Sequence, residues 1–210
     1  MNHKVTVIMA IFTISMSACR EGIQEPVENQ HDIKTGQVTD AIYYSSFDQP
    51  ESLFVDKSHE DVKTIDLNND GIMEFEIVSI EDTITVKDSN ENLRDYHVKK
   101  LFLRKYREGI YISAESITYN DYVAIIPKNT ILNFENQVWS PLDSIKMFCQ
   151  WERNIQAEFS YDFGIWNGNN NKYFAVNFQQ GDETIIAWIE ISIVEYDNYI
   201  LHNYASFILE

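Results

Sequence analysis

The sequence predicts an all-β fold for residues 38–210, an antiparallel β-sandwich or jelly-roll with at most one short helix. Most segments of this region are rich in Ile, Val, Tyr, Phe and Thr, which favour strands. Several alternate, as Phe174, Val176 and Phe178 do with Ala175, and this is typical of an antiparallel sheet with one solvated face. Clusters of Asn, Asp and Gly, which tolerate tight turns, separate the segments. A barrel is the alternative.

Nine segments fit strands by these criteria, and in chain order they are 41–47, 73–80, 83–87, 96–106, 109–113, 122–126, 173–178, 184–196 and 199–209. The turn clusters include KDSNEN at 87–92, WNGNNN at 166–171 and QQGDE at 179–183. One segment differs, because SPLDSIKMFCQWE at 140–152 has helix-like spacing. Ser140 could cap this helix, with Pro141 in its first turn. We therefore expect a short helix at this position.

Residues 1–18 have the features of an export signal. Lys4 precedes an apolar run of 14 residues, Val5–Ala18, which is shorter than the roughly 20 residues of a membrane span. The residues Met16-Ser17-Ala18 before Cys19 resemble a lipobox, in which a diacylglycerol is attached to the cysteine and cleavage makes it the first mature residue. We expect a lipoprotein signal peptide over 1–18 and lipidation of Cys19. An ordinary secretory signal cleaved near Ala18 is the alternative.

Lipidation would make the membrane a partner of the chain through Cys19. Each buried methylene of an acyl chain such as palmitate contributes about 0.8 kcal/mol, and two or three chains are needed for a stable anchor. Residues 19–37 are polar and predict a flexible tether with a reach of roughly 20 to 25 Å. The resemblance to bacterial lipoproteins implies the cell envelope, and Arg20 is compatible with the outer membrane of a Gram-negative bacterium. The sequence leaves open on which face of the membrane the domain lies.

The composition is strongly acidic, with a formal net charge of −17 and a pI near 4.6. This charge argues against nucleic acid as a partner and favours divalent cations near the surface. With Cys19 lipidated, Cys149 has no partner for an intramolecular disulfide. Cys149 lies among apolar residues in MFCQW, where we expect a buried, inert thiol. Stability must then come from packing, and a bound metal is a candidate for a further contribution.

A possible metal site lies in the segment DLNNDGIMEFEI, residues 66–77. Its pattern DxNxDG places short oxygen-bearing side chains at positions 1, 3 and 5 and a turn-forming glycine at position 6, and calcium binds six to eight such oxygens. We expect a structural calcium ion there, held by the following ligands: Asp66, Asn68, Asp70, the backbone carbonyl of Ile72 and Glu74.

The loop is not an EF-hand, because position 12 is Ile77 instead of glutamate and strand-like segments flank it. It is closer to the strand-flanked calcium loops of extracellular repeats, with an affinity of about 10⁻⁴ to 10⁻³ M. An Asx turn that binds no ion is the alternative.

Two blocks of the chain, together about a third of it, resemble a largely uncharacterised family of secreted or lipid-anchored proteins of Bacteroidetes. The first block is IDLNNDGIMEFEI, and the second contains YFAVNF, the turn GDET and the strand AWIEISI. Ala187 stands where the family usually has glycine. The resemblance implies a β-sandwich and no activity.

The sequence contains no recognisable catalytic motif such as GxSxG, HExxH, CxxC or a P-loop. Trp166, beside the polar turn 166–171, is a candidate for an exposed platform that stacks on a ligand, with core packing as the alternative. We expect a non-enzymatic binding or structural domain with no catalytic residues. A jelly-roll hydrolase acting on carbohydrate is the alternative. The sequence leaves two alternatives for the partner of this domain, a carbohydrate or an envelope protein.

Overall fold

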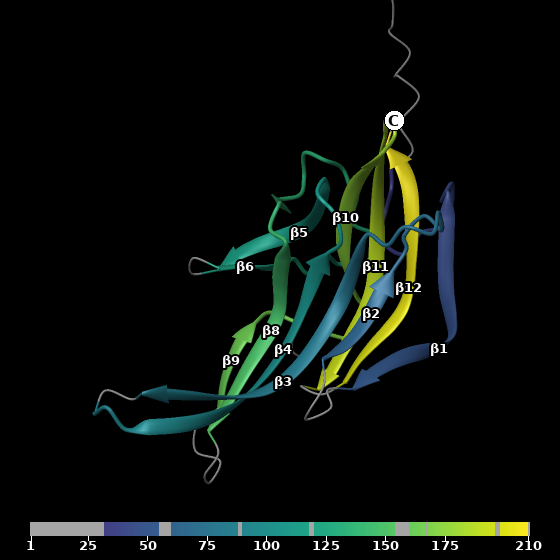
Figure 1. Ribbon diagram of the computed structural model, residues 1–210. Coiled ribbons are helices and arrows are strands. Elements are labelled where there is room, and N and C mark those ends of the chain that lie inside the picture. Colours follow the sequence, from purple (N-terminus) through teal and green to yellow (C-terminus); the bar gives the residue numbers. More distant parts are fainter. Residues whose placement is uncertain are drawn as a thin grey trace, which may run out of the picture. The chain divides into compact units, whose positions relative to one another are not determined.

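The structure, a computed structural model, describes residues 32–54, 60–87, 90–117, 120–153, 160–166, 168–195 and 198–209 (Figure 1). The chain divides into two units, Met1–Gln30 and His31–Glu210. The predicted signal peptide, Cys19 and most of the tether lie outside the described residues. The second unit confirms the predicted fold class, because it is all-β.

The described residues form twelve strands. They are β1 (Tyr43–Phe54), β2 (Asp61–Ile65), β3 (Phe75–Lys87), β4 (Leu93–Lys105), β5 (Ile110–Ile117), β6 (Asn120–Val123), β7 (Trp139–Ser140), β8 (Ser144–Arg153), β9 (Ser160–Gly164), β10 (Lys172–Gln180), β11 (Glu183–Glu195) and β12 (Asn198–Leu209).

The strands form one curled sheet in the order β1-β12-β11-β10-β5-β6-β8-β4-β3-β2, with β7 paired to β5 and β9 to β8. Figure 1 shows β10, β11 and β12 on one side and β3, β4 and β8 on the other. Among the described ladders, all are antiparallel except that between β6 and β8, where Tyr122 lies beside Lys146. No ladder among the described residues joins the two ends, β1 and β2, and the curled sheet is consistent with a β-sandwich or jelly-roll.

The main core lies between the two halves of the curled sheet. Phe75 of β3 and Phe174 of β10 are far apart in strand order, yet their rings meet edge to face at 6.0 Å. Leu101 and Leu103 of β4 are fully buried in the same cluster, opposite Val176 of β10 and other apolar side chains of that half. The period of two in the strands places these residues on the inner face.

A second apolar cluster covers the outer face of β10, β11 and β12. It includes Tyr173, Trp188 and Phe207, and Ile33 and Trp139 pack against it from outside the three strands. The expectation of one solvated face is therefore wrong for β10, in which Ala175 and its neighbours on both faces are buried. The physical reason is that segments remote in sequence cover this face.

The first described residues are part of this cover. The amide of Leu132 donates to the carbonyl of Ile33, and the buried Thr35 donates its hydroxyl to the carbonyl of Pro127 at 2.7 Å. The indole of Trp188 donates to the carbonyl of Gln37. Among the described residues, Ile33, Thr35 and Gln37 of the predicted tether therefore contact the domain.

Two local predictions are wrong. The segment 140–152 is not a helix but the end of β7 and most of β8, because ladders with β4 and β9 satisfy its backbone. The segments 73–80 and 83–87 are not separate strands, since β3 runs through both in unbroken register with β4. The described residues contain no helix, and hence none long and apolar enough to cross a membrane.

Gly164, at the end of β9, allows a close approach to β8. Its φ is +112°, and an added Cβ would lie 2.5 Å from the carbonyl oxygen of Met147 and 2.8 Å from Cα of Phe148. Backbone atoms cannot move aside as a flexible side chain can. A side chain at this position therefore requires β8 and β9 to separate.

We expect Gly164→Ala to lower the free energy of unfolding by roughly 3 kcal/mol or more, measured by urea denaturation. Gly181→Ala is the control, because its φ is +61° and no atom lies within 4 Å of an added Cβ. That control should cost only roughly 1 to 2 kcal/mol. Equal losses in the two variants would contradict the close approach of β9 to β8.

Candidate functional site

The acidic loop lies between two strands, as predicted. β2 and β3 are antiparallel, with Ile65 opposite Phe75, and the loop of residues 66–74 connects them. The amide of Glu74 donates to the carbonyl of Ile65 at 3.0 Å and closes the loop. Gly71, with a φ of +85°, makes the sharp turn that the motif predicts.

The carboxylate of Asp66 organises the inside of this loop. Its Oδ1 accepts the amides of Asn68 and Asp70, both at 3.3 Å, and its Oδ2 accepts the amide of Gly71 at 2.8 Å. Three backbone donors converge on one side chain, which is the role that a first-position aspartate has in a tight Asx-type turn. The loop is thus held from within.

Asn68 and Asp70 lie beside each other in the same turn. Asn68 Nδ2 donates to Asp70 Oδ2 at 3.1 Å, and Asn68 Oδ1 accepts the amide of Asp70 at 3.2 Å. Asp70 Oδ1 accepts the amide of Ile72. The structure therefore brings together three of the five predicted ligands, Asp66, Asn68 and Asp70, as hard oxygen atoms around one bend. Asp66 Oδ1 and Asp70 Oδ2 each accept two N–H donors, whereas Asp66 Oδ2, Asn68 Oδ1 and Asp70 Oδ1 accept one each. These last three oxygens keep a lone pair, so they fit a calcium ion in their chemistry.

The side chain of Glu74 binds Leu67 and Arg107 instead of joining the other predicted calcium ligands. This side chain is fully buried, Oε2 accepts the amide of Leu67 at 2.7 Å, and Oε1 pairs with the guanidinium of Arg107 at 3.0 Å. The side chain of Ile72 is exposed. In the described part of the chain, no group of three or more His, Cys, Asp or Glu side chains is placed to hold a metal. The convergent set is two carboxylates and one amide.

Burial raises the pKa of Glu74 to about 7. The hydrogen bond from Leu67 and the charge of Arg107 lower the pKa, whereas the nearby charges of Asp66 and Asp70 raise it. The cost of removing this carboxylate from water outweighs the stabilisation that its two partners provide. Glu74 is thus a titratable group buried in a region where the two halves of the sheet meet.

The loop also binds the opposite half of the sheet. The hydroxyl of Tyr204 in β12 donates to the carbonyl of Asp66 at 3.2 Å, and Ser206 Oγ donates to the carbonyl of Leu67. The side-chain amide of Gln180, at the end of β10, donates to Asp70 Oδ2 at 3.1 Å. The acidic loop therefore connects β2 and β3 to β10 and β12.

The prediction of an exposed platform at Trp166 is wrong. The side chain is fully buried, its indole nitrogen donates to the carbonyl of Val123 at 2.6 Å, and its ring packs edge to face on Phe174. A backbone carbonyl 43 residues away in sequence satisfies the indole, so the tryptophan belongs to the core.

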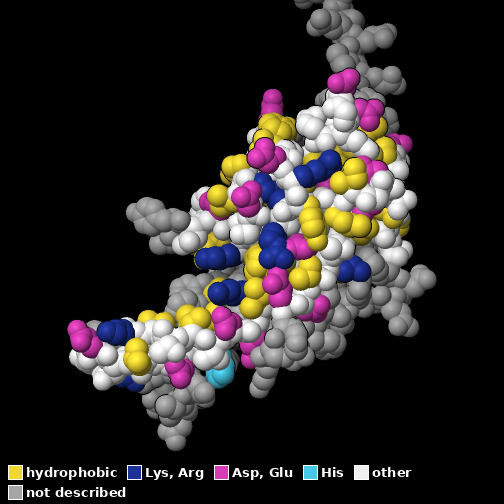
Figure 2. All heavy atoms as spheres, viewed as in Figure 1, with side chains coloured by type: hydrophobic (Ala, Val, Ile, Leu, Met, Phe, Trp, Pro, Cys, Tyr) yellow, Lys and Arg dark blue, Asp and Glu magenta, His cyan; other side chains and the backbone are white. Residues whose placement is uncertain are grey.

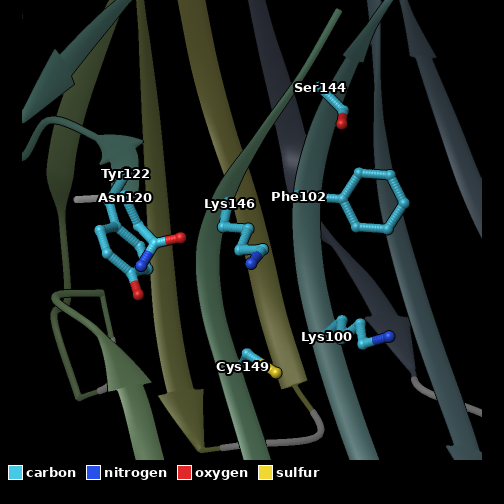
Figure 3. A pocket seen from close by; sticks show the side chains of 7 residues that line it. All are labelled: Lys100, Phe102, Asn120, Tyr122, Ser144, Lys146 and Cys149. Atoms are coloured by element: carbon cyan, nitrogen blue, oxygen red, sulfur yellow. The ribbon is translucent and has the colours of Figure 1, made fainter. Parts of the chain in front are cut away.

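A separate hollow of about 440 Å³ opens on the outer face of β4, β6 and β8 (Figure 3). Leu101 and Leu103 of β4 point into the core, so Lys100 and Phe102, which alternate with them, face outward. The hollow is lined by Lys100, Phe102, Asn120, Tyr122, Ser144, Lys146 and Cys149. Figure 2 shows dark blue and yellow side chains side by side on the face that it draws.

Strand register assembles this hollow. Lys100 of β4 lies opposite Cys149 of β8, Phe102 lies opposite Lys146, and Lys146 lies beside Tyr122 of β6. A bulge shifts the β4–β8 register after Leu101, so Lys146 and Cys149, three residues apart, line the same hollow. The volume is within the range of small-molecule sites.

Comparisons with protein-family models, with curated proteins and with solved structures found no match to this chain.

Sequence reasoning missed Lys100, Lys146 and the partner of Glu74, Arg107. A signal for Lys146 was present, because it alternates with Ile145 and Met147 as an outward residue of a strand does. The helix predicted for this segment hid that alternation. No local pattern connects Arg107 to Glu74, since 33 residues separate them.

Glu74 predicts a pH-dependent stability with a defined sign. Its pKa of about 7 in the folded state exceeds the ordinary value of 4.5, so the folded state binds the proton more tightly than the unfolded state. The free energy of unfolding should therefore fall as the pH rises from about 4.5 to about 7, by on the order of 3 kcal/mol from this group. Urea denaturation at a series of pH values, without added calcium, measures it.

Glu74→Gln should remove this contribution, because glutamine is neutral throughout and still accepts the amide of Leu67. The control is Glu60→Gln, which removes an exposed carboxylate paired with Arg104. In Glu60→Gln, the free energy of unfolding should change with pH as it does in the parent chain. Parallel pH profiles for the parent and Glu74→Gln would show that Glu74 does not titrate in this range.

Proposed function

We propose that this chain is a lipoprotein of the cell envelope, anchored through Cys19, whose β-domain has a non-enzymatic binding or structural role. In this proposal a calcium ion stabilises the acidic loop of residues 66–74. The observation that carries it is the convergence of Asp66, Asn68 and Asp70 in a loop that joins the two halves of the sheet.

The position of the loop gives calcium a structural effect. Asp66 and Asp70 repel each other, and both raise the pKa of the buried Glu74. A divalent cation between Asp66, Asn68 and Asp70 would offset this repulsion. Because Tyr204 and Gln180 bind the same loop from β12 and β10, a more stable loop also stabilises the contact between the sheet halves.

The carboxylates of this region support a structural role over hydrolysis. Glu74 pairs with Arg107, Glu76 and Glu60 pair with Arg104, and Asp66 accepts backbone amides. A pKa of about 7 would suit a general acid, but Glu74 is fully buried and bound on both oxygens, so a substrate has no route to it. The partners of these carboxylates therefore favour the binding or structural role over the hydrolase alternative.

Calcium should raise the melting temperature of the chain. For a dissociation constant of about 10⁻⁴ M, 10 mM calcium adds about 2.7 kcal/mol, which for a domain of this size corresponds to a rise of about 5 to 10 °C. Melting followed by circular dichroism in calcium and in chelator, at equal ionic strength, measures the difference.

Asp70→Ala should abolish this rise, whereas Asp182→Ala, which removes an exposed aspartate from the β10–β11 turn, should keep it. Both variants lose one turn carboxylate, and Asp70→Ala also loses the hydrogen bonds from Asn68, Ile72 and Gln180. The comparison is therefore the difference in melting temperature between calcium and chelator within each variant. Coincident melting curves of the parent chain in calcium and in chelator would end the calcium proposal.

Cys19→Ser should prevent incorporation of radiolabelled palmitate in cells and should move the protein from the membrane fraction to the soluble fraction. Cys149→Ser is the matched control, because Cys19 and Cys149 are the two cysteines of the chain. It should keep both the label and the membrane association. Label retained by Cys19→Ser would contradict lipidation at this residue.

A further inference from the structure

The two lysines of the hollow on β4, β6 and β8 differ from Arg104 and Arg107. Arg104 binds Glu60 and Glu76, and Arg107 binds Glu74. Within the described residues, no hydrogen bond or ion pair engages the ammonium of Lys100 or Lys146. The chain has 33 acidic and 16 basic residues, so carboxylates to pair with them are abundant.

Lys100 and Lys146 are also close to each other. Lys146 lies opposite Phe102, two residues from Lys100, and the bulge between these pairs leaves both lysines on the lining of the same hollow. Like charges at such positions repel, and an anion between them would remove the repulsion. The flexible stems let both ammonium groups reach a common carboxylate.

The remaining lining favours an anion that carries a polar ring. Figure 3 shows Lys146 between Tyr122 and Asn120 on one side and Phe102 on the other. The ring of Phe102 is partly exposed and offers an apolar face, on which the C–H face of a sugar can pack. The amide of Asn120 and the hydroxyl of Ser144 can bond sugar hydroxyls, since each both donates and accepts.

The overall charge limits how many negative charges the ligand carries. At a net charge of −17, each further negative charge on a ligand is repelled by the rest of the molecule. Two lysines carry two positive charges and cannot offset a polyanion, and within this limit the net charge of the molecule favours one negative charge on the ligand over two. The favoured ligand is therefore a small acid with a single carboxylate.

We propose that the hollow formed by Lys100, Phe102, Tyr122 and Lys146 binds a sugar acid, a pyranose ring that carries one carboxylate. The two lysines hold the carboxylate and Phe102 packs on the ring. The site is separate from the acidic loop, so it adds a ligand class to the binding role proposed above without depending on calcium.

The test is a calorimetric titration of the full chain carrying Cys19→Ser with four probes: D-glucuronate, D-glucose, acetate and inorganic sulfate. D-glucuronate should bind at least tenfold more tightly than each of the others, because glucose lacks the charge and acetate and sulfate lack the ring. Equal binding of sulfate and glucuronate would reduce the site to a general anion site, and equal binding of glucose would exclude the role of the lysines. Absence of glucuronate binding would overturn the proposal.

Variants then assign the residues. Lys100→Gln with Lys146→Gln should weaken glucuronate binding more than tenfold, whereas the matched pair Lys87→Gln with Lys172→Gln, which removes the same charge elsewhere, should leave it unchanged. Phe102→Leu keeps an apolar residue and should weaken glucuronate but not acetate. Unchanged glucuronate binding in the first pair would contradict the proposal.

A second readout needs no substitution in the hollow. With Cys19 replaced, Cys149 is the remaining thiol of the chain, and it lines the hollow. Cys149 is 8 % exposed, so its alkylation by iodoacetamide is slow. Saturating D-glucuronate should slow the alkylation further, and D-glucose should not; no protection by glucuronate would overturn the proposed position of the ligand. Asp70→Ala should retain glucuronate binding, so a failed calcium proposal and a failed sugar-acid proposal give different results.

Discussion

The structure depends on a buried carboxylate at the junction of the two halves of the sheet. Glu74 accepts the amide of Leu67 and pairs with Arg107, whose guanidinium lies 5.6 Å from the centre of the Phe178 ring in β10. Tyr204 and Gln180 bind the same loop from the opposite half. The acidic loop therefore connects the two halves of the sheet around the core. Because of this position, the charges of its side chains affect the stability of the domain.

Several carboxylates of this acidic chain have hydrogen-bond or ion-pair partners, which reduces their mutual repulsion. Backbone amides converge on Asp66, and arginines bind Glu60, Glu74 and Glu76, so many carboxylates near the acidic loop already have partners. Glu74 and Glu76 are buried in these pairs, whereas Lys100 and Lys146 have no carboxylate partner among the described residues. The net negative charge and a local positive hollow are therefore compatible.

The two outer faces of the sheet have different roles in this arrangement. The face of β10, β11 and β12 is covered by residues such as Ile33 and Trp139, which completes a second apolar cluster. The face of β4, β6 and β8 keeps a hollow with both charged and aromatic side chains. Apolar side chains thus cover one face, whereas the other face keeps an open hollow.

The sequence alone determined the fold class and the position of the acidic loop. Strand formation depends on side-chain alternation and turn residues, which are local, and the DxNxDG motif places Asp66, Asn68 and Asp70 around one bend by spacing alone. Only the tertiary structure decided that Glu74 turns to Arg107, that Trp166 is buried against Val123, and that 140–152 is strand. These outcomes depend on ladders and contacts between segments tens of residues apart, and a one-residue change in register reverses which face a side chain occupies. The hollow between Lys100 and Lys146 exists for the same reason, because β4, β6 and β8 come together only when the sheet is assembled.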